Sequence, residues 1–356
     1  MNDIAEPRIY LDENGITIKC TPNCKVGYKE VVNGVEYEVV DRELLEQRIE
    51  KGSDLTKVVT SLITDMSELF RSRKFTNSII SPIGNWDVSN VTDMSNMFEE
   101  SIFNQPIGDW DVSSVKSMSW MFYNTPFNQP IGGWDVSKVK NMSWMFMDSS
   151  FNQPIGEWDV GSVKSMSGMF YNTPFNQPFG DWDVGNVADM SCMFRNSPFN
   201  QPIGDWDVSS VTDMSEMFEG SIFNQPIGDW DVSNVTDMSG MFHNSRFNQS
   251  IDRWIVSSVV DFSGMFMLSI FNKPIENWDV GCAKEMRLMF SNSLFNQPLA
   301  SWDVSNVIDM REMFRGSKFN QPINEWCVKN IPFEPLSFSI DCPLAEENKP
   351  VWGTCP

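Results

Sequence analysis

The side chains with the clearest chemical potential are aspartates that recur every 24 residues, each directly after a tryptophan. They stand at positions 87, 111, 135, 159, 183, 207, 231, 279 and 303. Such a row could bind calcium, but a calcium site needs about six to eight converging oxygens, and each repeat supplies one carboxylate beside a turn. We therefore expect these aspartates to cap turns by accepting backbone hydrogen bonds. The sequence predicts neither a metal nor another cofactor.

A catalytic constellation is not evident in the sequence. His243 is the only histidine, and other repeats carry unrelated side chains at its position. A catalytic histidine needs a positioned nucleophile or acid beside it, and nothing in the repeat supplies one for this position alone. Paired carboxylates are common, but they are copies of one unit, so no pair is distinguished from the others. The sequence therefore predicts a protein that is not an enzyme.

The cysteines gather in the two end segments of the chain. Cys20 and Cys24 lie near the start and Cys327, Cys342 and Cys355 near the end, whereas Cys192 and Cys282 replace ordinary repeat residues. Cys20 and Cys24 could form half of a zinc site, but zinc usually takes four ligands and the single histidine lies far along the chain. Disulfides that pin the two ends fit better, and they would indicate an oxidising compartment.

The charge of the chain excludes some partners. The 356 residues carry a net charge of −22, with 48 acidic against 26 basic side chains. Nucleic acid and anionic membranes need basic side chains to displace counterions, so neither is expected as a partner. No run approaches the roughly 18 apolar residues of a membrane-spanning helix. The first residues of the chain as given lack the basic and apolar regions of a secretory signal.

A strict repeat organises most of the chain. Tryptophan recurs at positions 86, 110, 134, 158, 182, 206, 230, 254, 278, 302 and 326, a constant spacing of 24 residues. A fixed period of this length is typical of a solenoid, in which each coil buries its apolar side against its neighbours. Val115, Met118 and Phe122 have the spacing of one helical face. We expect an α/β-type solenoid whose coils combine a short strand with a short helical turn.

The asparagine after each repeat phenylalanine, from 104 to 320, is expected to form a ladder between neighbouring coils rather than a binding row.

Three regions follow from this pattern. Residues 1–61 are expected to form an N-terminal cap of a hairpin plus a helix, with strands at 16–20 and 35–40, an Asn-Gly hairpin turn between them, and a helix at 41–51 that ends at glycine. Residues 62–326 form the solenoid of about eleven repeats, and its first repeat, at 75–86, has an atypical spacing between phenylalanine and tryptophan. Residues 327–356 form a C-terminal cap.

The positions that vary between repeats indicate a binding surface. The residue before the last methionine and the residue after the following phenylalanine share one face. In three consecutive coils this face carries aromatic residues or methionine: Trp120, Tyr123, Trp144, Met147 and Tyr171. Aromatic and methionine side chains are enriched in binding surfaces. The alternative is that these side chains only shield one another or are covered by the cap.

The unit from Phe223 to Phe242, with its Trp-Asp-Val-Ser-Asn-Val-Thr-Asp-Met core, resembles the repeat of BspA-like leucine-rich-repeat surface proteins, a group that includes mycoplasma lipoproteins. The resemblance covers about residues 62–326. Ser250, Phe262, Lys273 and Ala283 depart from it within single coils.

The resemblance implies a leucine-rich-repeat-like coil and a surface role in adhesion or protein binding, with no catalytic residues. The end of the chain resembles the cap that closes such arrays, which implies a disulfide between Cys327 and Cys355. We expect an exported, surface-displayed protein whose partner is a protein or a glycan. The alternatives are a structural spacer and a carbohydrate-binding module that uses the aromatic residues. The sequence does not indicate an oligomeric state.

Overall fold

The computed structural model describes residues 6–72 and 82–356, so part of the atypical repeat at 75–86 lies outside the described residues. Its contacts divide the chain into two compact units. Unit 1 consists of Met1–Val163 with Gln177–Trp182, and unit 2 of Lys164–Asn176 with Asp183–Pro356. Within the described residues, no helix is both long and apolar enough to cross a membrane.

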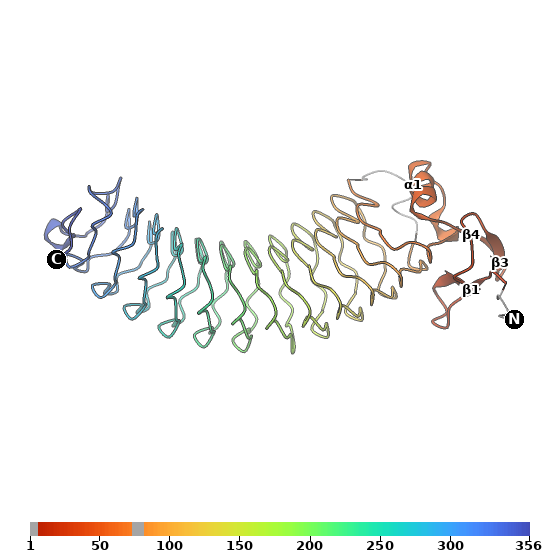
Figure 1. The fold of residues 1–356 in the computed structure, drawn as a ribbon, viewed down its shortest axis with the longest axis horizontal. Helices are drawn as coiled ribbons and strands as arrows, with labels where there is room; N and C mark the ends of the chain where they lie inside the picture. Colours follow the sequence, from red (N-terminus) through yellow and green to blue (C-terminus); the bar gives the residue numbers. More distant parts are fainter. Residues whose placement is uncertain (1–5, 73–81) are drawn as a thin grey trace. The chain divides into compact units, whose positions relative to one another are not determined.

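The regular elements of unit 1 lie before the repeats (Figure 1). They are β1 (Ile9–Leu11), β2 (Ile18–Cys20), β3 (Lys29–Val32), β4 (Val35–Val39), α1 (Arg42–Glu50), η1 (Leu55–Lys57) and β5 (Val58–Val59). β1 and β2 pair antiparallel, as do β3 and β4, and β5 adds to β4 in parallel.

The local sequence explains two of these elements. Asn33 and Gly34 both have positive φ, 50° and 82°, which is the requirement of the tight turn that joins β3 to β4. α1 begins after Asp41, whose side chain accepts a hydrogen bond from the amide of Leu44, and it ends just before Gly52. The helix and the Asn-Gly turn therefore form where the sequence predicts them. The hairpin partner is different from the expected one, because β4 pairs with β3, whereas the strand expected at 16–20 pairs with β1.

Backbone hydrogen bonds join each repeat to the next within each unit. The amides of Met118, Trp120 and Phe122 donate to carbonyls of the following coil at 3.0, 3.0 and 2.9 Å. The amides between them bond inside their own coil, as from Met121 to the Met118 carbonyl at 3.2 Å. Along residues 118–122, the amides that bond another coil therefore all donate to the following coil.

The expectation of a short helical turn in each coil is wrong. The described residues of the repeats form tight turns instead, and Trp120 has φ 60°. A left-handed residue ends helical geometry, and its amide then points to the next coil. The helical spacing of Val115, Met118 and Phe122 reflects burial of all three residues within a turn-rich coil.

Aromatic columns form the core of both units. The Trp134 and Trp158 rings stack in unit 1 with centroids 6.5 Å apart, and Trp230 and Trp254 stack in the same way in unit 2. The Trp134 indole N–H also donates to the carbonyl of Ile107 in the preceding coil at 3.1 Å. Each tryptophan therefore supplies both apolar burial and a directional bond between coils.

The asparagine row forms a ladder beside this core. The Asn104 side-chain oxygen accepts a hydrogen bond from the backbone amide of Asn128 at 3.0 Å and another from the Gln129 side chain at 3.0 Å. In unit 2 the amide of Asn224 donates to the side chain of Asn200 at 2.9 Å. Each of these asparagine side chains therefore accepts a hydrogen bond from the backbone of the next coil, so its oxygen is used within the fold.

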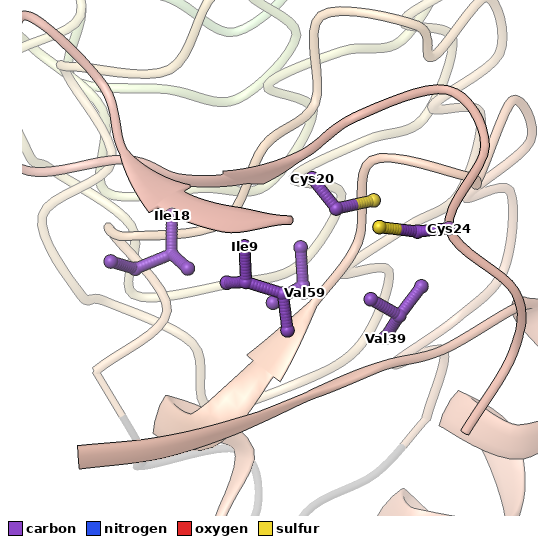
Figure 2. Packing of buried hydrophobic residues seen from close by; sticks show 6 residues of the cluster. All are labelled: Ile9, Ile18, Cys20, Cys24, Val39 and Val59. Carbon is purple, nitrogen blue, oxygen red and sulfur yellow. The ribbon is translucent and has the colours of Figure 1, made fainter. Parts of the chain in front are cut away.

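The cysteines at the two ends differ. Cys327 and Cys355 form the disulfide that the family resemblance implied. The expectation of a disulfide at Cys20 and Cys24 is wrong, because both are free thiols. Figure 2 shows them in a buried cluster with Ile9, Ile18, Val39 and Val59, where cysteine packs as a small apolar residue. Burial, partly offset by Ser61, raises the pKa of Cys20 to about 11, so its thiol stays protonated at neutral pH.

Candidate interaction surface

Unit 1 brings Trp120, Tyr123 and Trp144 together. The rings of Trp120 and Trp144 stack with centroids 5.3 Å apart, and Tyr123 meets Trp120 edge to face at 5.1 Å. Met147 follows Trp144 in the same turn, and its amide donates to the Trp144 carbonyl at 3.2 Å. All four side chains are half-buried. We call these four residues the aromatic patch.

The two tryptophans occupy a backbone position that suits glycine. Trp120 and Trp144 have φ values of 60° and 61°, and the same row position is filled by Gly240 and Gly264, at 62° and 63°, in unit 2. A left-handed conformation costs a residue with a Cβ about 1–2 kcal/mol. The coil therefore does not require tryptophan there, and a bulky side chain in this conformation suggests selection for something other than local backbone stability.

The surroundings of Tyr123 are acidic. Burial, followed by the charges of Asp148, Glu100 and Glu99, raises the pKa of the Tyr123 hydroxyl. The side chain is therefore a neutral phenol at physiological pH, with a hydroxyl that can donate and accept hydrogen bonds. The aromatic patch combines apolar ring faces with a polar group at its edge.

Tyr171, the fifth residue that the sequence assigned to this surface, belongs to unit 2. There the guanidinium carbon of Arg195 lies 5.4 Å from the centre of its ring, a cation–π contact. Arg195 also pairs with Glu216, and with Glu219 at 3.0 Å. Nδ1 of His243 lies 3.3 Å from Glu219. This ionic network was not predicted, because its members come from three repeats.

Cys192 lies beside the same network. Its sulfur donates to Glu216 at 3.4 Å. Burial, and then the charge of Glu216, raises the pKa of Cys192 to about 12. The reactive form of cysteine is the thiolate, so this side chain is not an activated nucleophile at neutral pH.

The aspartates that follow the tryptophans cap turns. The Asp111 carboxylate accepts from the amide of Ser113 at 3.1 Å, and Asp207 accepts from Ser209 at 3.0 Å. Across residues 6–72 and 82–356, no group of three or more His, Cys, Asp or Glu side chains is placed to hold a metal ion.

A second acidic row runs along unit 2. Parallel backbone bridges connect Asp213, Asp237, Asp261, Glu285 and Asp309 in order. Burial, followed by the charges of Asp309 and Asp261, raises the pKa of Glu285. The sequence carried the signal, an acidic residue before the first repeat methionine or, at Asp261, before the phenylalanine that replaces it, but only the stacking shows that the carboxylates are neighbours.

These features define a repeat protein with a variable outer surface. The family model for mycoplasma proteins of unknown function, DUF285, matches six overlapping stretches: 42–149, 103–198, 124–221, 172–270, 193–294 and 244–334. Together they span residues 42–334, well over half of the chain, and the chain therefore belongs to the DUF285 family. No curated protein and no solved structure matches it.

Proposed function

We propose that the chain is a non-catalytic interaction module, displayed at a cell surface, that binds a protein or glycan partner through the aromatic patch. The observation that carries the proposal is the pair of stacked tryptophans at a position with positive φ. Gly240, Glu216 and Leu288 fill the same position in other coils with similar φ, so the backbone does not dictate tryptophan there, and the stacked rings are what distinguishes these two coils.

The same proposal includes the fold class and the location. The stacked 24-residue coils, joined by backbone bridges within each unit, support classification as a solenoid related to BspA-like leucine-rich repeats. The net charge of −22 favours solubility of a long exposed surface. Adhesion is the role that this classification suggests for the aromatic patch.

A glycan partner is a specific form of the proposal. Trp120 and Trp144 are stacked within 22° of parallel, and Tyr123 adds a hydroxyl beside them. Ring faces pack against the apolar faces of sugars, and a nearby hydroxyl can bond a sugar hydroxyl. A spacer, which is the alternative from the sequence, would bind neither sugars nor proteins through these side chains.

The test replaces Trp120 and Trp144 by serine in the full chain. A glycan array and a pull-down against surface proteins are probed with the wild type, this double variant, and Leu288→Ser as a matched control. Leu288 has the same row position in unit 2, with φ 62°. We expect at least a tenfold loss of binding in the double variant only. Unchanged binding by a folded double variant would refute the role of the patch, and no ligand for the wild type would support the spacer.

A further inference from the structure

The last coil of unit 2 ends in a row of unused backbone donors. Its carbonyls at Leu336, Phe338 and Ile340 accept from the preceding coil at 3.0, 2.8 and 2.7 Å. The alternate amides of this coil belong to Ser337, Ser339 and Asp341. Within the described chain, these three amides have no protein acceptor.

Two coils earlier in unit 2, the corresponding amides are all used. Leu288, Phe290 and Asn292 donate to the next coil at 3.0, 2.9 and 2.7 Å. Ser337 and Asp341 retain the positive φ of that pattern, 55° and 58°. The last coil therefore has the geometry of a donating coil, and its donors face outward. We call Ser337, Ser339 and Asp341 the donor edge.

The corresponding acceptor edge in unit 1, the carbonyls of Ser67, Leu69 and Arg71, is covered at one position. Arg42 at the start of α1 donates to the carbonyls of Asp65 and Ser67 at 3.1 and 2.6 Å, in the first coil. A second copy of the chain would have to offer the carbonyls of Ser67, Leu69 and Arg71 to the donor edge, and Arg42 already occupies the carbonyl of Ser67. Two donor edges cannot pair with each other, because both present only N–H groups.

A hollow of ≈ 480 Å³ lies along the donor edge, lined by the last coil and by Glu346 of η3 (Glu346–Asn348). Leu336 is 70% exposed and Ile340 is 54% exposed. Open backbone donors beside exposed apolar side chains are the two requirements for adding an extended peptide to a sheet edge.

The donor edge selects the chemistry of that peptide. An ordinary strand presents both C=O and N–H groups on its pairing side, but the carbonyls of the last coil are already engaged. Proline offers a carbonyl and no N–H, so a proline-rich segment loses no hydrogen bond there, and its rings can cover Leu336 and Ile340. The charged side chains that line the hollow are Glu334, Glu346 and Lys349. Asp341 and Glu347 directly follow lining residues in the sequence, so acidic groups exceed basic ones at this end, which favours basic flanks.

From these contacts we propose that the donor edge binds an extended, proline-rich segment of another protein that has lysine or arginine at its flanks. The site is separate from the aromatic patch and does not depend on the function proposed for that patch.

The test measures fluorescence anisotropy of two labelled synthetic peptides on the full chain. One has alternating prolines between two lysine pairs, and the other has alanine in place of every proline. Ser339→Pro removes one donor, and Ser339→Ala retains it as the matched control. Leu336→Asp disturbs the apolar contact, with Ile255→Asp, at an exposed site in another coil, as its control.

We expect the proline peptide to bind, the alanine peptide to bind at least tenfold more weakly, and Ser339→Pro and Leu336→Asp each to weaken binding at least tenfold. Hydrogen exchange should show protection of residues 335–342 by the peptide. If Ser339→Pro does not fold, the peptide affinity of Leu336→Asp and the hydrogen-exchange data test the proposal instead.

Three results would overturn the proposal. One is equal affinity for the two peptides, or no measurable affinity for either. Another is loss of binding in Trp120→Ser, which would place the peptide on the aromatic patch. The third is a concentration-dependent dimer in sedimentation that Leu336→Asp abolishes, which would make a second copy the occupant.

Discussion

Two adjacent glycines in unit 1 allow the close stacking of coils to be tested. A Cβ added at Gly132 would lie 2.8 Å from the carbonyl oxygen of Pro154 in the next coil, whereas a Cβ at Gly133 would have nothing within 4 Å. Neither glycine has positive φ. Gly132→Ala and Gly133→Ala therefore add the same atom to the same turn, and only the first adds it at the contact between coils.

The expected costs follow from these distances. An ordinary contact needs about 3.4 Å, so the Pro154 carbonyl must move by several tenths of an ångström, and overpacking of this kind costs about 1–3 kcal/mol. Asp252 and Glu276 hold the corresponding place in unit 2, so the backbone can accommodate a Cβ, and we expect about 1 kcal/mol. Gly133→Ala should stabilise by about 0.4–1 kcal/mol, because alanine restricts the unfolded chain.

Urea unfolding followed by tryptophan fluorescence measures the difference, with hydrogen exchange to localise it. Repeat arrays can unfold in several steps, so exchange in residues 131–134 and 154–158 is the more direct readout. We expect faster exchange there in Gly132→Ala and no change in Gly133→Ala. Equal destabilisation by the two substitutions would refute this reasoning. It would show that stability depends on the flexibility of glycine and not on the close approach of the Pro154 carbonyl.

Three further outcomes are expected. Deletion of residues 207–230 should leave a folded protein in circular dichroism and size exclusion, because the coil register is kept, whereas deletion of 207–218 should cause aggregation; equal tolerance would contradict nearest-neighbour stacking. Glu285→Gln should raise stability at pH 7 by about 0.5 kcal/mol. The raised pKa of Glu285 means that its charged form destabilises the fold, so this gain should vanish as the pH falls below the usual glutamate range, and a gain that persists in acid would refute the cause. Cys355→Ser should destabilise the C-terminal segment by about 3 kcal/mol, seen as faster exchange near Cys327, and no change would show that the disulfide is dispensable.

The period of the sequence was sufficient to predict which residues lie in one column. Trp134 and Trp158 stack because each coil has the same length, and the helix after Asp41 forms because its cap and its glycine stop are local signals. The pattern could not show that Trp120 has positive φ. That conformation depends on an amide that bonds the next coil, which is a contact between repeats.

The candidate site was predictable only in part for the same reason. Proximity of Trp120 and Trp144 follows from the period, but the stacking of their rings does not. The sequence groups Tyr171 with them because it lies one period after Met147, and it could not show the cation–π contact between the Tyr171 ring and Arg195. Cys20 and Cys24 were expected to form disulfides because of their position near the start of the chain, yet both lie as free thiols in an apolar cluster.

The direction of the hydrogen bonds between coils gives the two ends of the array different chemistry. Each coil donates toward the C-terminus along one stretch, so the first coil retains acceptors and the last retains donors. The guanidinium of Arg42 covers two of these acceptors, the carbonyls of Asp65 and Ser67. A side chain that covers the donors would need acceptors, and Glu334 and Glu346 instead bond Lys349. The donor edge is therefore a feature of unit 2 that a partner can bind without displacing an existing hydrogen bond.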